Sequence, residues 1–180
     1  MELNPDNIFV WSSYIDLFLK EKDYQKAKKM IEKAMKIDPN NPYFKVLLVR
    51  YCLEANIIKV EKIKDFLVGL SLKSSVEIRV VIYNMLGKSE ENIERAREYF
   101  ARSYEILPCN IVTLNTWAEK EIESGDLDKA EALLEEGVSI DEENAYIYKV
   151  KAKLAEKRGD REREREFIEK AKSLGLDIAS

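Results

Sequence analysis

Three stretches of the chain share one length and one order of features, and this repetition limits the possible folds more than any other property of the sequence. They run from Ile8 to Asn41, from Ile111 to Asn144 and from Ala145 to Ile178, and each is 34 residues long. Each holds two apolar patterns of helical spacing on either side of a short polar turn. Because one helical hairpin cannot bury its apolar face alone, neighbouring hairpins must pack on one another. The sequence therefore predicts an all-α fold of stacked antiparallel helix pairs.

Turn and stop signals recur at matching places in the three copies. Gly125-Asp126 and Gly159-Asp160 mark the turn between the two helices of the later copies, and Asp23 takes the equivalent place in the first. Pro39 ends the second helix of the first copy, because proline cannot continue a helix. The repetition therefore includes the turns as well as the apolar faces.

These places resemble the tetratricopeptide repeat. That family has a large residue at the fourth place, Gly-Asp at the turn, small residues at the twentieth and twenty-seventh places and proline at the thirty-second. The first copy fills its pattern with Trp11, Tyr14, Phe18, Asp23, Ala27, Ile31, Ala34 and Pro39. The resemblance implies a right-handed α-solenoid of about five helix-turn-helix repeats, with about ten antiparallel helices, and a protein-interaction scaffold rather than an enzyme.

We predict a single repeat array over residues 1–180, with repeats at approximately 8–41, 42–70, 71–110, 111–144 and 145–178. The second repeat departs from the pattern, because Glu61 and Val68 stand where small residues are expected. In the third, the segment from Gly87 to Asn92 predicts a longer loop between the helices than the family uses, and the register of its first helix stays open. The segment from Leu3 to Asn7 resembles the end of a preceding repeat, although helix capping by Asn7 explains it equally well.

A second resemblance is narrower. The run from Trp117 to Glu121, followed by Gly125-Asp126 and Lys129-Ala130, together with Arg95-Ala96-Arg97, resembles the half-a-tetratricopeptide subfamily of RNA-processing scaffolds. It keeps open an alternative role as a structural subunit or fragment of an RNA-processing assembly. A homodimeric co-chaperone is a further alternative.

Several functional classes are disfavoured by composition. The chain has no His, which excludes His-based triads, general bases and metal sites. Glu119 and Glu123 lie one helical turn apart, a pattern more typical of a salt-bridged face than of a catalytic pair. We therefore expect no catalytic activity, no cofactor and no metal. The formal net charge of -4 argues against direct nucleic-acid binding. No apolar run is long enough to cross a membrane, and without a secretory signal we expect a cytoplasmic location.

The resemblance also implies where a partner binds. In this family the second, fifth, ninth, twelfth and thirteenth places of each repeat face an inner groove, which the first helices line. The predicted groove residues are Phe9, Ser12, Asp16, Leu19, Tyr43, Val46, Arg50, Asn115, Glu119, Glu123, Tyr146, Lys149, Lys153 and Lys157. Ser12 and Asp16 replace the Lys and Asn with which some family members hold a C-terminal carboxylate, which argues against that clamp.

Charge in the last two repeats permits two interpretations. Residues 111–144 have a net charge of -9 and residues 145–180 one of +3. Glu119 and Glu123 could attract a basic peptide and orient it against Lys149, Lys153 and Lys157. Alternatively, these acids and bases neutralise one another across the repeat boundary, which we favour for the charges while keeping the groove as the binding surface. The expected partner is a protein or peptide, with basic character under the first interpretation.

Overall fold

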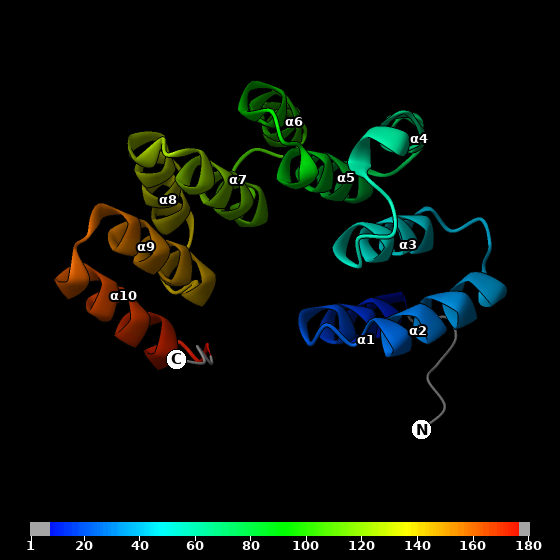
Figure 1. Cartoon of the computed structure of the whole chain (residues 1–180), viewed down its shortest axis with the longest axis horizontal. Helices are drawn as coiled ribbons and strands as arrows, with labels where there is room; N and C mark the ends of the chain where they lie inside the picture. The colour runs from blue at the N-terminus through cyan, green and yellow to red at the C-terminus, as the bar shows by residue number, and fades with distance from the viewer. Residues whose placement is uncertain (1–7, 177–180) are drawn as a thin grey trace. The chain divides into compact units, whose positions relative to one another are not determined.

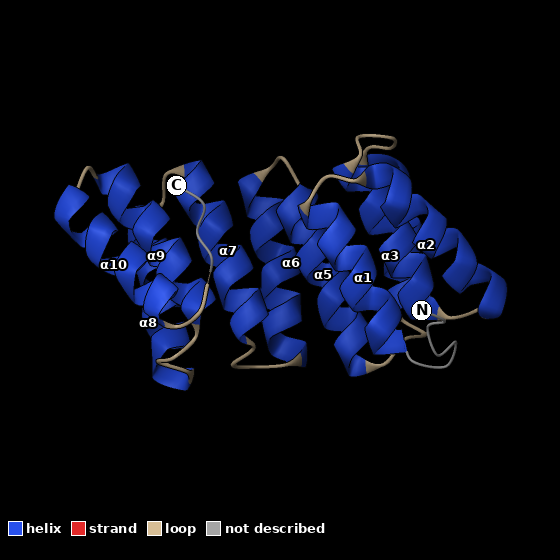
Figure 2. Cartoon of the chain, turned by 90° about the horizontal axis from the view of Figure 1, so that it is seen from below, coloured by secondary structure: helices blue, strands red, loops and turns tan. Residues whose placement is uncertain are grey.

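Every regular element in the described part of the chain is a helix (Figures 1 and 2). The computed structural model describes residues 8–176, apart from the side chains of residues 8, 9 and 60, so the segment from Leu3 to Asn7 lies outside it. The helices are α1 (Ile8–Lys20), α2 (Tyr24–Ile37), α3 (Pro42–Glu54), α4 (Lys64–Ser71), α5 (Val76–Ser89), α6 (Ile93–Ile106), α7 (Ile111–Ser124), α8 (Leu127–Ile140), α9 (Ala145–Arg158) and α10 (Arg161–Ser173), with a 3₁₀ turn at Val60–Lys62. The predicted all-α fold of paired helices is confirmed. Within the same residues, no helix is both long and apolar enough to span a bilayer.

The chain divides into two compact units, Met1–Ile82 (unit 1) and Tyr83–Ser180 (unit 2). In unit 1, α1 packs on α2 and both contact α3. In unit 2, α7 packs on α8, and α9 contacts α7, α8 and α10. A single array over residues 1–180 stays a prediction.

Capping side chains begin the helices at the places that the repeat pattern marks. Asn41, Asn110 and Asn144 accept a hydrogen bond from the first backbone N–H groups of α3, α7 and α9. Asp23, Asp126 and Asp160 do the same for α2, α8 and α10. The first helices α3, α7 and α9 therefore begin after Asn, and the second helices α2, α8 and α10 begin after Asp.

A left-handed residue ends the first helix of three repeats. Gly125 and Gly159 adopt φ values of 92° and 77° after α7 and α9, a conformation that glycine takes without steric cost. Lys22 reaches φ 56° in the equivalent turn after α1, where the repeat lacks its usual glycine. Unit 1 thus keeps the left-handed turn with Lys22, although a lysine adopts a positive φ less readily than a glycine.

The core of unit 1 joins the first three helices. Its buried residues are Trp11, Ile15, Leu19, Ala27, Ile31, Ala34, Phe44, Leu47 and Tyr51. Ala27 and Ala34 are fully buried on α2, where their small side chains allow the neighbouring helices to approach closely.

The second repeat is irregular, as its sequence predicts. Its second helix, α4, has only eight residues and follows the 3₁₀ turn. Phe66 and Leu72 are 52% and 78% exposed. Leu67 of α4 is fully buried, but Phe66 on the same helix is not, so α4 buries only part of its apolar side chains.

The core of unit 2 is formed mainly by α7, α8 and α9. Its buried residues are Leu114, Ala118, Ile122, Ala130, Leu133, Leu134, Ile147, Val150 and Leu154. Ala118 and Ala130 are fully buried where α7 meets α8, so the same small-residue rule holds in this unit.

The prediction of a longer loop from Gly87 to Asn92 is wrong. Helix α5 continues through Ser89, and only three residues separate it from α6. Gly87 is a packing residue, because a Cβ atom there would lie 2.8 Å from the Phe100 ring. Counting from the start of α5 places Asn84 at the ninth position of its helix, the place that Asp16 and Glu119 hold in theirs.

Candidate partner-binding surface

The first helices of successive repeats contact each other within each unit. In unit 1, α1 touches α3, and in unit 2, α7 touches α9. Predicted groove residues on these helices therefore come from neighbouring elements. Phe9 lies on α1, but its side chain is outside the described residues.

The ninth places of paired repeats form ion pairs. Arg50 Nη1 lies 2.5 Å from Asp16 Oδ1, and Lys153 Nζ lies 2.6 Å from Glu119 Oε1. In each pair an acid on the first helix meets a base on the first helix of the next repeat, 34 residues later. Burial opposes the charge of Arg50, but its hydrogen bonds and charge interactions with Glu54 and Asp16 raise its pKa. At this place, acid and base neutralise each other across the repeat boundary.

Three predicted groove residues are buried. Ser12 is 7% exposed, Leu19 2% and Val46 1%, and Leu19 belongs to the core of unit 1. Tyr43 is half-buried and packs against the same core. Because Ser12, Leu19 and Val46 are buried beneath the surface, they are not part of the proposed contact set.

The second places of α7 and α9 are accessible. Val112 is 64% exposed and Tyr146 is 45% exposed. Lys149 Nζ lies 5.8 Å from the centroid of the Tyr146 ring, within the range of a cation–π contact. The N-terminal ends of α7 and α9 thus present exposed apolar side chains, with the cation of Lys149 beside them.

A cavity of about 200 Å³ lies between α7 and α9, nearer their C-terminal ends. It is lined by Glu119, Ile122, Glu123, Lys153, Glu156 and Lys157. Glu123 is 70% exposed, and the nearest cation, Lys120, is 3.7 Å away. Glu156 and Lys157 form no ion pair within the described part of the chain. The structure therefore brings together four of the predicted residues: Glu119, Glu123, Lys153 and Lys157.

Two asparagines have buried side-chain oxygens without a hydrogen-bond partner. They are Asn115, which was predicted for the groove, and Asn84, which was not. Asn84 Nδ2 donates to Thr113 Oγ1 over 3.0 Å, which ties α5 to α7. Asn84 was not predicted because the expected loop left the register of this helix open. Counting places from the start of α5 identifies it.

A buried carboxylate links three helices of unit 2 and was also missed. Glu121 on α7 is fully buried. It accepts two hydrogen bonds from Arg97 of α6, at 2.9 and 2.7 Å, and one from Trp117 Nε1 at 2.8 Å. Lys129 Nζ of α8 lies 3.2 Å from the same carboxylate. Burial acts to raise the pKa of Glu121, but these partners hold it below its usual range.

This network uses the residues that resemble the half-a-tetratricopeptide subfamily. Trp117, Glu121, Lys129 and Arg97 all take part in it, and Arg97 also reaches Asp126 at 2.8 Å. Their contacts are with one another, so they fix how α6, α7 and α8 pack. Among residues 10–176 with described side chains, no three acidic or cysteine groups are arranged as metal ligands.

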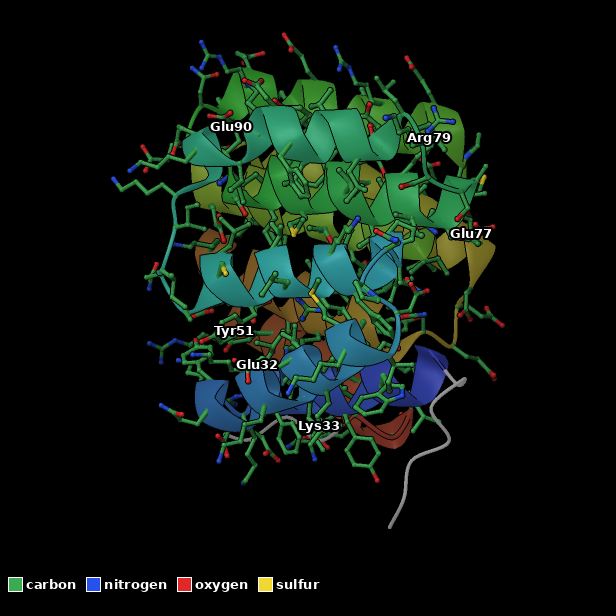
Figure 3. All side chains as sticks on the ribbon, turned by 90° about the vertical axis from the view of Figure 1, so that its right-hand side faces the viewer. Glu32, Lys33, Tyr51, Glu77, Arg79 and Glu90 are labelled. Atoms are coloured by element: carbon green, nitrogen blue, oxygen red, sulfur yellow. The ribbon has the colours of Figure 1, made fainter. Side chains whose placement is uncertain are left out.

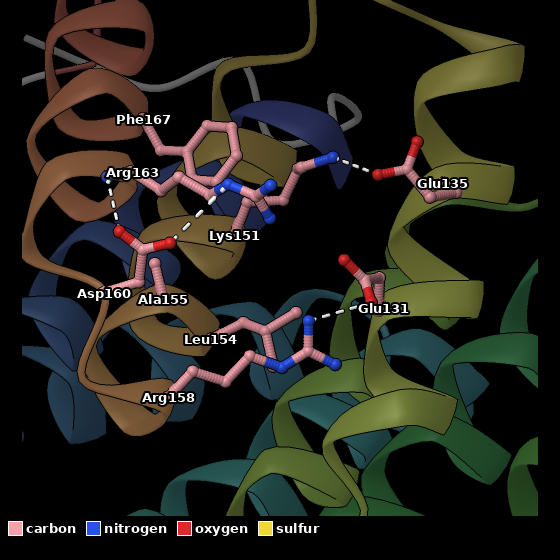
Figure 4. A pocket seen from close by; sticks show the side chains of 9 residues that line it. All are labelled: Glu131, Glu135, Lys151, Leu154, Ala155, Arg158, Asp160, Arg163 and Phe167. Atoms are coloured by element: carbon pink, nitrogen blue, oxygen red, sulfur yellow. Dashed lines mark hydrogen bonds and ion pairs between the residues drawn. The ribbon is translucent and has the colours of Figure 1, made fainter.

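A second cavity, of about 230 Å³, lies on the opposite face of α9 (Figure 4). It is lined by Glu131, Glu135, Lys151, Leu154, Ala155, Arg158, Asp160, Arg163 and Phe167, none of which was predicted for the groove. Its charged side chains pair with each other: Lys151 with Glu135, Arg158 with Glu131, and Arg163 with Asp160. Because these charged side chains already pair with each other, this cavity offers a partner fewer unpaired charged groups than the cavity between α7 and α9.

Paired helices with adjacent first helices define the class of the protein as a helical-hairpin repeat protein. Models of the tetratricopeptide repeat match residues 16–41 and 89–154. The chain belongs to the tetratricopeptide repeat superfamily, as its sequence predicts.

Solved structures agree with this fold. One crystal structure of MamA has a TM-score of 0.52 and 19% identity over 96% of this chain and 97% of its own. Another has a TM-score of 0.52 and 19% identity over 89% and 93% of the two chains. At this identity, the similarity concerns the fold alone. Repeats of this superfamily are generally non-catalytic interaction modules, and the fold supports a general role as a protein–protein interaction scaffold.

Proposed function

We propose that the chain binds a segment of a partner protein on the surface that α7 and α9 form in unit 2. The observation that carries this proposal is the cavity of about 200 Å³ between these first helices, all six of whose lining residues occupy groove places of the repeat. The equivalent surface of α1 and α3 in unit 1 offers Asp16, Tyr43 and Arg50, and we propose it as a secondary contact.

The chemistry of the surface favours a segment with a basic and an apolar side chain. Glu119 is paired with Lys153 at 2.6 Å. Glu123, by contrast, lies 3.7 Å from Lys120, and Glu156 forms no ion pair in the described part of the chain. Glu123 and Glu156 are therefore the more accessible carboxylates for a partner. The excess of negative charge in residues 111–144 would also attract a basic segment. At the other end, Val112 and Tyr146 offer exposed apolar area.

The distance between the two ends sets the length of the segment. Tyr146 and Lys157 are separated by eleven residues of α9, which corresponds to about 16 Å along the helix axis. An extended chain covers that distance with about five residues. We therefore propose a partner motif with an aromatic or aliphatic residue and a Lys or Arg about five residues apart.

Affinity capture with cross-linking and mass spectrometry tests this function. The bait variant Tyr146→Ala/Glu123→Gln/Glu156→Gln removes one apolar contact and two charges from the surface. The matched control, Ile140→Ala/Glu142→Gln/Glu143→Gln, removes the same number of each outside it. We expect a partner recovered by the wild type and the control to be lost with the first variant, at unchanged helical circular dichroism. Equal recovery with all three baits would refute the proposed surface.

A role in an RNA-processing assembly is the first alternative. It rests on the net charge of +3 in residues 145–180. However, Lys151, Lys153 and Arg158 are paired with carboxylates of α7 and α8, which leaves fewer cations for phosphate. A mobility-shift titration with single-stranded RNA across salt concentrations discriminates, since direct phosphate contact requires affinity to fall steeply with salt.

The second alternative is a homodimeric co-chaperone. Light scattering over a range of protein concentrations distinguishes it, because a dimer with no separate partner would form without any added protein.

A further inference from the structure

Helix α2 in unit 1 carries a row of cations that form no ion pair in the described part of the chain. Its sequence has five lysines and one glutamate. Lys29, Lys33 and Lys36 follow the spacing i, i+4, i+7 and therefore share one face of the helix. All three are exposed and form no ion pair. Figure 3 labels Lys33 on α2 beside Glu32.

The remaining two lysines of α2 are engaged. Lys26 Nζ lies 2.7 Å from Asp23, and Lys28 Nζ lies 3.9 Å from Glu32. Glu32 is also within a turn of Lys29 and Lys36, yet it forms an ion pair with neither. Lys29 interacts with Asp23 by charge alone, and none of Lys29, Lys33 and Lys36 forms an ion pair with a described residue. Like charges at this spacing destabilise a helix slightly.

The equivalent helix of unit 2 uses its charges to pair with the first helix of the next repeat. On α8, Asp128 and Glu131 pair with Arg158 of α9, and Glu135 pairs with Lys151. Lys151 holds the seventh place of its repeat, and Leu48 holds that place on α3. The three acids of α8 hold the places that Gln25, Lys28 and Glu32 hold on α2, so α3 offers no counter-charge to that face. The exposed Lys29, Lys33 and Lys36 lie on the neighbouring face of α2.

We propose that this lysine face of α2, defined by Lys29, Lys33 and Lys36, binds an acidic segment of a partner protein. The face extends about 10 Å along the helix, which suits about three carboxylates at helical spacing on the partner. Ile37, one turn from Lys33 and 44% exposed, adds apolar contact at its end. Electrostatic complementarity selects the partner and speeds its encounter.

The same observations favour a protein segment over a nucleic acid. The basic face is short, because the caps Asp23 and Asp38 bound α2 at its two ends. A longer polyphosphate would extend beyond it on a chain whose net charge is -4. Tyr24, the one aromatic residue of α2, is half-buried and donates a hydrogen bond to the Glu54 carbonyl, so it offers no stacking platform for bases.

Fluorescence anisotropy with a labelled synthetic peptide tests this site. The probe is a peptide of about 14 residues, long enough to form a helix on binding, with Glu at i, i+4 and i+7 and Leu beside them. The variant Lys29→Gln/Lys33→Gln/Lys36→Gln keeps good helix formers on α2. Its control, Lys59→Gln/Lys62→Gln/Lys73→Gln, removes the same charge from exposed lysines elsewhere in unit 1.

We expect the α2 variant to bind the acidic peptide about tenfold more weakly, because three exposed ion pairs are lost, and the control to change affinity less than about twofold. Wild-type affinity should fall as salt rises. Equal weakening by both variants, or an absence of binding at low salt, would overturn the proposal. Tighter binding of a twelve-nucleotide RNA or of phosphatidylserine vesicles than of the peptide would also overturn it. The same holds if light scattering shows that the protein self-associates and thereby loses peptide binding. The surface variant with Tyr146→Ala should leave this binding unchanged, which separates the site from the proposed function.

Discussion

The two units join successive helix pairs by different means. In unit 2, ion pairs connect one repeat to the next: Arg97 of α6 reaches Glu121 of α7, and Arg158 of α9 reaches Asp128 and Glu131 of α8. In unit 1, α2 and α3 pack through apolar and small side chains. The ion pair between the repeats of this unit joins the two first helices, from Asp16 of α1 to Arg50 of α3.

This difference shows that one repeat pattern tolerates two kinds of junction. Residues 1–82 contain 14 Lys and Arg against 11 acidic residues, and residues 83–180 contain 16 against 23. Unit 2 holds many of its charges in internal pairs, whereas unit 1 leaves the lysines of α2 exposed. Charges that are not used for packing remain available to partners.

Removing the buried carboxylate of unit 2 should have the largest effect. Glu121→Ala leaves the Arg97 guanidinium without its main partner, so we expect the free energy of unfolding to fall by about 4 kcal/mol. Asp16→Ala in unit 1 should cost less than about 1 kcal/mol, because its pair is partly exposed. Urea denaturation followed by tryptophan fluorescence measures both, with Trp11 as the probe of unit 1 and Trp117 as the probe of unit 2.

Single-tryptophan backgrounds provide the control for this measurement. In Trp117→Phe the emission of Trp11 should not respond to Glu121→Ala, and in Trp11→Phe the emission of Trp117 should not respond to Asp16→Ala. Equal costs for the two substitutions would mean that the ionic junction of unit 2 has no special role.

A smaller effect is expected from filling the space at Gly87. The Phe100 ring lies against Gly87 and stacks on Trp117, with centroids 5.8 Å apart. Gly87→Ala pushes this ring toward Trp117 and should cost about 2 kcal/mol by urea denaturation. The double variant Gly87→Ala/Phe100→Leu should recover part of that loss. If it does not, the ring contact is not the cause.

Acid should weaken the junction in unit 2 through Glu121. Its pKa in the folded protein lies below the usual 4.5. The stabilisation is therefore fully present above pH 4.5 and is lost as the pH falls through the lower, folded-state pKa. Glu121→Gln should lower stability at pH 7 and flatten the decline between pH 5 and lower pH, as measured by urea midpoints of the Trp117 signal. An unchanged slope would contradict this assignment.

The smallest effect concerns the two ninth-place pairs. Double-mutant cycles for Glu119 with Lys153 and for Asp16 with Arg50 should each give a coupling energy below about 1 kcal/mol that decreases with salt. If the coupling of one pair reaches that of Glu121 with Arg97, the exposed groove charges contribute to the junction and not only to the surface.

The candidate surface was predicted in part. Places counted along the repeat found Glu119, Glu123, Lys153 and Lys157, which line one cavity. The same counting included Leu19 and Val46, which are buried, because a place in a repeat specifies a helix face but not what packs over it. Trp117 and Glu121 carried a family resemblance without revealing that they hydrogen-bond to each other.

The sequence by itself determined the helix pairs, their caps and the packing of small residues such as Ala27 and Ala130. These features depend on local periodicity and on side chains within a few residues of each helix end. Only the tertiary structure decided that Gly87 is helical, that Glu121 is buried among three helices and that the lysines of α2 have no counter-charge on α3. Such contacts join residues dozens of positions apart, and they form only once the crossing of the helices brings those side chains together.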